Sequence, residues 1–143
     1  MSDYFTYPDP ARDHAGFGQR VVFGDADHVI AEALMIRPLG REFEVICHTC
    51  PRTGLLAPLV RGVATLRPTA RLARLLRAEP HYHGGPVRLV ACAAGAETPG
   101  VAQNLADMLQ VVVVAPTAPL GPWHGRMVIY GGRWRRFRPF AHA

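Results

Sequence analysis

The sequence predicts an α/β domain in which helices flank a small, mostly parallel sheet. Short apolar runs alternate along the chain with segments of helical periodicity, which is the pattern of βαβ units. One run, Val111–Val114, is entirely β-branched, and this favours a strand buried on both faces. It follows a helical segment that itself follows the run Pro86–Cys92. A strand–helix–strand unit of this length predicts a right-handed, parallel crossover.

The first half of the chain contains two of the predicted strands. Residues 1–20 lack periodicity and are expected to form an N-terminal arm, so the single domain 1–143 has its α/β part over 21–143. The expected elements are a short strand at Gln19–Phe23, a helix over Asp25–Met35 capped by Asp25 or Asp27, a strand over Phe43–His48, and a hairpin over Leu55–Leu66 that turns at Arg61 and Gly62.

The second half of the chain contains the predicted crossover and a C-terminal β-hairpin. The expected elements are a helix that begins at Pro68 and carries the apolar stripe Leu72, Leu75 and Leu76, a strand into Cys92, a helix capped by Thr98 with Pro99 in its first turn, a strand at Val111–Val114 stopped by Ala115 and Pro116, and a closing hairpin of Met127–Tyr130 and Trp134–Phe137.

The amino-acid composition indicates a folded protein without a membrane-spanning helix. Of the 143 residues, 49% are hydrophobic and 19% charged, so the chain is expected to fold around a core. No apolar stretch approaches the ~20 residues that a membrane helix needs, and we expect no membrane span. The first residues lack the basic end and apolar core of a signal peptide. We therefore expect a protein that is cytoplasmic in the producing cell, unless a specialised secretion system exports it.

The net charge of +5 comes with an unusual basic composition, because all sixteen basic residues are arginine. Codon bias in a GC-rich genome is the simplest explanation, and bidentate recognition of carboxylate or phosphate is the functional one. The arginines are spread from Arg12 to Arg138 and no nucleic-acid-binding motif accompanies them. A nucleic-acid partner is therefore not expected.

Two apolar runs end on side chains that can carry out nucleophilic chemistry. One run ends at His48 and the other at Cys92, 44 residues later, a separation that a hairpin and one helical crossover would fill. Open α/β sheets place their reactive groups beyond the carboxyl ends of parallel strands. An imidazole and a thiol brought together there would form a nucleophile and its base. The alternative is that Cys92 is a small core residue.

The surroundings of these two residues resemble caspase-like (clan CD) cysteine peptidases, in particular bacterial polymorphic-toxin and effector domains. The resemblance rests on Val87–Gly95, on Gly100–Ala106 and on Val114–Thr117, and it covers about residues 43–140. It implies a three-layer caspase-like sandwich with Cys92 as nucleophile and His48 as base. It also implies that the backbone N–H groups of Thr49 and Cys92 stabilise the oxyanion. Thr49 stands where these peptidases usually have glycine.

The same resemblance implies a hydrolase that acts as a bacterial effector or toxin on a protein or peptide substrate, with an immunity or chaperone protein as a further partner. The alternative is a non-catalytic module of the same fold that binds a protein through its arginine- and tryptophan-rich end, Trp134–Arg138.

The cysteines leave one more class of function open. Three cysteines without a signal peptide predict free thiols, two of them packed as small apolar groups. Cys47 and Cys50 form a C-x-x-C pair, which is compatible with redox chemistry. Zinc would need a second pair such as Cys92 with His81 or His83. No second C-x-x-C is present, and we expect neither a cofactor nor a metal.

Overall fold

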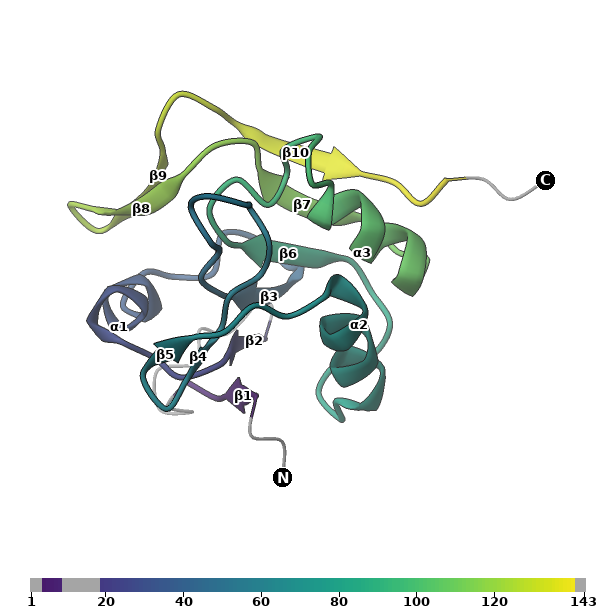
Figure 1. Ribbon diagram of the computed structural model, residues 1–143, viewed down its shortest axis with the longest axis horizontal. Helices are drawn as coiled ribbons and strands as arrows, with labels where there is room; N and C mark the ends of the chain where they lie inside the picture. The colour runs from purple at the N-terminus through teal and green to yellow at the C-terminus, as the bar shows by residue number, and fades with distance from the viewer. Residues whose placement is uncertain (1–3, 9–18, 141–143) are drawn as a thin grey trace.

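A mixed six-stranded sheet organises the computed structural model, which describes residues 4–8 and 19–140 (Figure 1). Its four inner strands are parallel, and an antiparallel strand lies at each edge. The strands are, from one edge to the other, β1 (Phe5–Thr6), β2 (Arg20–Phe23), β3 (Phe43–Ile46), β6 (Val87–Val90), β7 (Val113–Pro116) and β10 (Trp134–Phe137). The predicted α/β class and mostly parallel sheet are confirmed.

Other elements pack on both faces of the sheet. Helices α2 (Thr69–Ala78) and α3 (Val101–Leu109) bury one face in the larger apolar cluster. Helix α1 (His28–Leu34) and the hairpin of β8 (Leu120–Trp123) and β9 (Arg126–Ile129) cover part of the other face. Because strand residues alternate between faces, Leu89 belongs to the first cluster and Val90 to the second.

The segment that connects β3 to β6 contains the hairpin and the helix that the sequence predicts. It contains the short hairpin of β4 (Leu59–Val60) and β5 (Val63–Ala64), followed by α2. The hairpin turns at Arg61 and Gly62, whose φ angles of 52° and 80° are those of a type I′ turn. The crossover returns the chain to the strand next to β3, so β3 and β6 are hydrogen-bonded parallel neighbours.

The predicted C-terminal hairpin is wrong. Strand β9 pairs with β8, while β10 joins the main sheet antiparallel to β7, with Phe137 opposite Val113. This pairing buries Phe137 in the core and satisfies the edge of β7. Strand β8 is not predicted from the sequence, because it contains Gly121 and Pro122, which are poor strand formers. The structure tolerates them because β8 belongs to a two-stranded ribbon.

Several predicted boundaries also move. Helix α3 begins at Val101 after Gly100 (φ 79°), so Thr98 does not cap it and Pro99 is not in its first turn. Strand β7 begins at Val113 and includes Pro116, because the chain leaves α3 through Gln110 (φ 56°) and needs the next two residues to turn. Pro68 flanks α2, which begins one residue later.

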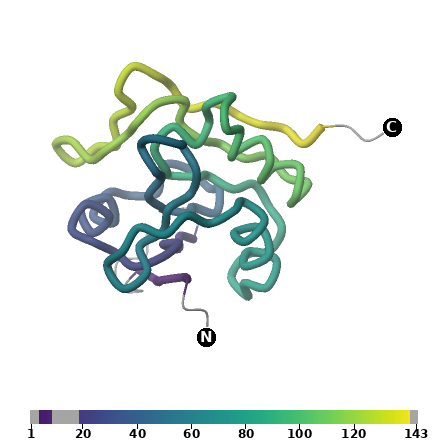
Figure 2. Tube along the Cα trace, in the orientation of Figure 1, coloured from purple at the N-terminus to yellow at the C-terminus, as the bar shows by residue number. Residues whose placement is uncertain are grey.

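The predicted N-terminal arm is partly a strand, because Phe5 and Thr6 pair with β2. Residues 1–3 and 9–18 of the arm lie outside the described part of the chain. The first and last strands of the chain, β1 (purple) and β10 (yellow), form opposite edges of the sheet (Figure 2). None of the helices in the described part of the chain is long and apolar enough to cross a membrane.

Candidate active site

The carboxyl ends of β3 and β6 bring the two predicted catalytic segments to one edge of the sheet. Ile46 and Val90 are the last paired residues, and His48 and Cys92 each follow two positions later. The N–H of Cys47 donates to the carbonyl of Val90 at 3.1 Å, which extends the ladder by one residue. The two loops that follow are therefore held side by side.

A side-chain hydrogen bond joins these two loops directly. The hydroxyl of Thr49, the residue after His48, donates to the carbonyl oxygen of Cys92 at 2.9 Å. Because Thr49 directly follows His48 in the sequence, this bond holds the loop of His48 against the loop of Cys92. The two loops are therefore bonded to each other and not only close in space.

The imidazole of His48 has a carboxylate partner from the neighbouring strand. Its Nε2 lies 3.0 Å from Oδ2 of Asp27, which follows β2 and caps α1 by accepting from the N–H of Ile30 at 3.0 Å. Burial alone would raise the pKa of Asp27, but the hydrogen bonds from Ile30 and His48 outweigh it and lower that pKa. Asp27 is therefore ionised, Nε2 carries the proton, and Nδ1 is the nitrogen able to accept one.

Cys92 lies at the start of a tight turn and is partly exposed. Its thiol donates to the carbonyl oxygen of Leu120 in β8 at 3.3 Å. Ala93 has a positive φ of 52°, a conformation that costs an alanine about 1 kcal/mol. Two residues later, a Cβ on Gly95 would lie 2.9 Å from the carbonyl oxygen of Ala115. The small residues after Cys92 thus allow the turn to pack directly on β7.

The structure brings together the segments of His48 and Cys92, whereas their functional groups face other partners. In the part of the chain that the structure describes, no hydrogen bond joins the imidazole to the thiol. The imidazole contacts Asp27 and the thiol contacts Leu120. The predicted pairing of the imidazole with the thiol therefore stays a prediction.

The two backbone N–H groups assigned to the oxyanion are both available. Within the described residues, neither the N–H of Thr49 nor that of Cys92 donates a hydrogen bond. Thr49 forms an isolated bridge with Leu56, but the bonds of that bridge come from the N–H groups of Cys50 and Ala57. Thr49 is not among the residues of positive φ, so a side chain in place of glycine causes no backbone strain here.

The C-x-x-C pair consists of two unlike thiols. Cys47 is buried, its thiol donates to the carbonyl of His48 at 3.0 Å, and burial raises its pKa. Cys50 is partly exposed, and hydrogen bonds from the Thr53 hydroxyl and from the N–H groups of Thr53 and Arg52 lower its pKa. All three cysteines are free, as predicted, but only Cys47 is buried, so the expectation of two packed thiols is wrong.

The topology separates the residues that a zinc site would need. His81 and His83 precede β6 and Cys92 follows it, so they lie at opposite ends of that strand. His81 instead contacts Glu79, with 2.8 Å between Nδ1 and Oε1. Among the described residues, no three His, Cys, Asp or Glu side chains group as metal ligands do.

Asp27 is the site residue that sequence reasoning missed, because it was considered only as a helix cap. A signal was present: the segment after β2 carries Asp25 and Asp27, so a third strand of the sheet also ends on side chains with acid–base chemistry. The arginine- and tryptophan-rich end forms β10, and its Trp134 pairs with Pro116 at the carboxyl end of β7.

A family model described as "Domain of unknown function (DUF8616)" matches residues 19–128. The match includes Asp27, His48 and Cys92, and it ends before β10. No curated protein and no solved structure matches the chain.

Proposed function

We propose that this chain, which belongs to the family described as Domain of unknown function (DUF8616), is a cysteine hydrolase with Cys92 as nucleophile and His48 as base. One observation carries the proposal: His48 and Cys92 follow adjacent parallel strands, and the Thr49 hydroxyl joins their loops. Nucleophile and base are expected at such a strand edge. Asp27 adds a third member that orients the imidazole.

The reaction begins with a proton transfer. The Cys92 thiol leaves the Leu120 carbonyl by rotating about its Cα–Cβ bond and gives its proton to Nδ1 of His48. The thiolate attacks the carbonyl carbon of the substrate, and the imidazolium then protonates the leaving amine as the C–N bond breaks. Water attacks the resulting thioester with His48 again acting as base, which releases the acid and restores the thiol.

Two further contributions lower the barrier. The carboxylate of Asp27 stabilises the imidazolium formed in the first step, as a buried aspartate does in other triads. The N–H groups of Thr49 and Cys92 are the donors for the oxyanion of the tetrahedral intermediate. Both belong to the pair of loops that the Thr49 hydroxyl holds together.

The substrate class follows from the resemblance to caspase-like peptidases. We propose a peptide bond in a protein or peptide, cleaved by a bacterial effector or toxin domain that a specialised secretion system delivers. An immunity or chaperone protein that covers the Cys92 edge of the sheet would protect the producing cell.

Exposure to a proteome-derived peptide library tests the activity. Mass spectrometry should find new peptide ends with the native protein and none with Cys92→Ala. The control variant Cys50→Ala removes the other partly exposed thiol and should cleave like the native protein. Cleavage that persists in Cys92→Ala, or a folded native protein that generates no new ends, would contradict the proposal.

A growth assay tests the toxin proposal separately. Induced expression of the native chain in a bacterial cytosol should arrest growth, while Cys92→Ala at the same protein level should not. Equal growth arrest by both proteins would show that any toxicity is independent of hydrolysis.

A further inference from the structure

The face of the sheet that α1 covers in part also carries a row of charged side chains outside the candidate active site. Directly paired residues of neighbouring strands point to the same side of a sheet. The pairing therefore places five residues in one row across β2, β3, β6, β7 and β10, namely Arg20, Glu44, Arg88, Val114 and Arg136. The adjacent row on this face is apolar and includes Val22, Ile46 and Val90.

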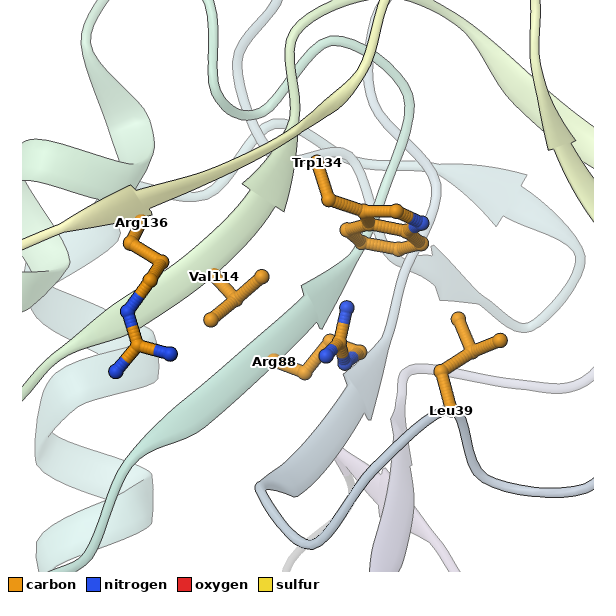
Figure 3. Close-up of a pocket in the computed structure, with 5 residues that line it drawn as sticks. All are labelled: Leu39, Arg88, Val114, Trp134 and Arg136. Atoms are coloured by element: carbon orange, nitrogen blue, oxygen red, sulfur yellow. The ribbon is translucent and has the colours of Figure 1, made fainter.

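A cavity of about 370 Å³ opens at the β10 end of this row (Figure 3). Arg88, Val114 and Arg136 line it from the row, and Trp134 lines it from two positions earlier on β10. Leu39 closes it from the loop before β3, and that loop is fixed by the bond from the Leu39 N–H to Glu44 (2.7 Å). The volume is in the range of small-molecule sites.

The charges in the row do not cancel at the cavity. Arg20 is paired with Glu44 at 2.8 Å, and Arg88 with Glu42 at 2.7 Å. Arg136 is exposed, and among the described residues no carboxylate lies within ion-pair distance of it. The cavity therefore has a net positive charge at its Arg136 end.

At the opposite end of the cavity, the Trp134 ring and the paired Arg88 are held in place. The guanidinium carbon of Arg88 lies 4.7 Å from the centre of the Trp134 ring, and its Nε and Nη2 both donate to one oxygen of Glu42. Figure 3 shows the Arg88 guanidinium close beside the indole, with Val114 between Arg88 and Arg136. An aromatic wall and a cationic end thus face one hollow.

We propose that this cavity binds a small organic oxyanion with a flat ring, either a carboxylate or a phosphate ester. The oxyanion would bind Arg136, whose fork of N–H donors matches both groups. The ring would lie over Val114, between Arg136 and the stacked pair of Arg88 and Trp134. The site is built mainly on residues of strands β6, β7 and β10, so binding there does not depend on the hydrolase proposed for the loops after β3 and β6.

Tryptophan fluorescence tests the proposal, because the chain has two tryptophans and Trp123→Phe leaves only Trp134. Titration of this variant with benzoate, phenyl phosphate and uncharged benzyl alcohol should give a saturable change with at least one anion and none with the alcohol. The anion that binds with the higher affinity shows whether the site prefers a carboxylate or a phosphate ester. No saturation with either anion, or equal binding of benzyl alcohol, would overturn the proposal.

Two matched variants in the same background locate the anion. Arg136→Gln should weaken binding about tenfold or more, the contribution expected of a hydrogen bond to a charged group. Arg135→Gln removes the same charge from the other side of β10, where the guanidinium stacks on Phe137, and should change affinity by less than about twofold. Arg136→Lys should give an intermediate loss. Equal weakening by both glutamine variants would overturn the assignment.

Discussion

At the scale of single residues, Asp27 shows how one carboxylate can have two structural roles. Its Oδ1 accepts from the N–H of Ile30 and caps α1, while its Oδ2 accepts from the imidazole of His48. The cap fixes the position of the carboxylate, and the carboxylate fixes the tautomer of the imidazole. Helix α1 thereby contributes to the proposed reaction without containing a reacting group.

Substitution of Asp27 separates these two roles. Asparagine is a good cap but carries no charge, so Asp27→Asn should lose only the stability that the charge contributes and should reduce hydrolysis strongly. Alanine removes the cap as well, so Asp27→Ala should also lose about 1 kcal/mol of stability. Thermal melts and peptide cleavage by the two variants measure both effects. Full hydrolysis by a folded Asp27→Asn would show that the imidazole needs no carboxylate.

Residue-level prediction from the sequence succeeded where the pattern was local. The strand ends at His48 and Cys92 could be recognised because apolar runs stop there, and Asp27 as a cap because it precedes a helical pattern. The bond from Asp27 to His48 could not be predicted, because it spans 21 residues and depends on the order of β2 and β3 in the sheet. The same holds for the bond of the Cys92 thiol to Leu120.

At the scale of elements, β10 is the clearest difference between prediction and structure. Local sequence predicts a hairpin with the preceding strand, because two β-prone runs flank Gly131 and Gly132. In the structure β10 pairs with the edge of β7 instead, because that pairing buries Phe137. The short β8, which the predicted hairpin ignored, pairs with β9 instead.

The pairing of β10 with the main sheet predicts unequal effects for two phenylalanines near the C-terminus. Phe137 is 6% exposed and Phe140 is 64% exposed. Phe137→Ala should cost about 3–5 kcal/mol of unfolding free energy, the usual loss for a buried aromatic side chain, while Phe140→Ala should cost little. Denaturant unfolding of both variants checks this. Similar small losses would place β10 outside the core.

At the scale of the whole molecule, the stability is expected to depend on pH at both ends of the scale. Burial opposes ionisation of Asp27 and Glu79, but hydrogen bonds outweigh it and lower the pKa of each. Their contribution to stability is present above about pH 4 and is lost as the pH falls through the lowered values. Burial, with the hydrogen bond and charge of Glu79, raises the pKa of Tyr7 to about 12.

The raised pKa of Tyr7 predicts the alkaline limit. The folded chain keeps the phenol proton that the unfolded chain releases near pH 10, so stability should fall between about pH 10 and about 12. Tyr7→Phe should remove this part of the decline and leave the acid side unchanged. Thermal melts of both proteins from pH 3 to 11 would check it, and identical alkaline profiles would contradict the contact of Tyr7 with Glu79.

The fold class was predictable from sequence because it follows from the alternation of strand and helix patterns, whereas the full strand order was not. The adjacency of β3 and β6 could be inferred from a single crossover. The cavity beside Trp134 could not, although Arg20, Glu44 and Arg88 interrupt otherwise apolar strands. Those charges acquire a common face only when the register of β2, β3 and β6 is known.

The proposed reaction requires that His48 activates the thiol of Cys92, and alkylation kinetics test this step most directly. Iodoacetamide labelling at pH 7 in a Cys50→Ser background, resolved by peptide mass spectrometry, leaves buried Cys47 as the slow internal reference. An unactivated thiol is only a few per cent ionised at this pH, so Cys92 should react about tenfold or more faster than in the matched His48→Gln variant. It should also react well before Cys47. Equal rates with and without His48, or labelling of Cys47 before Cys92, would contradict the claim.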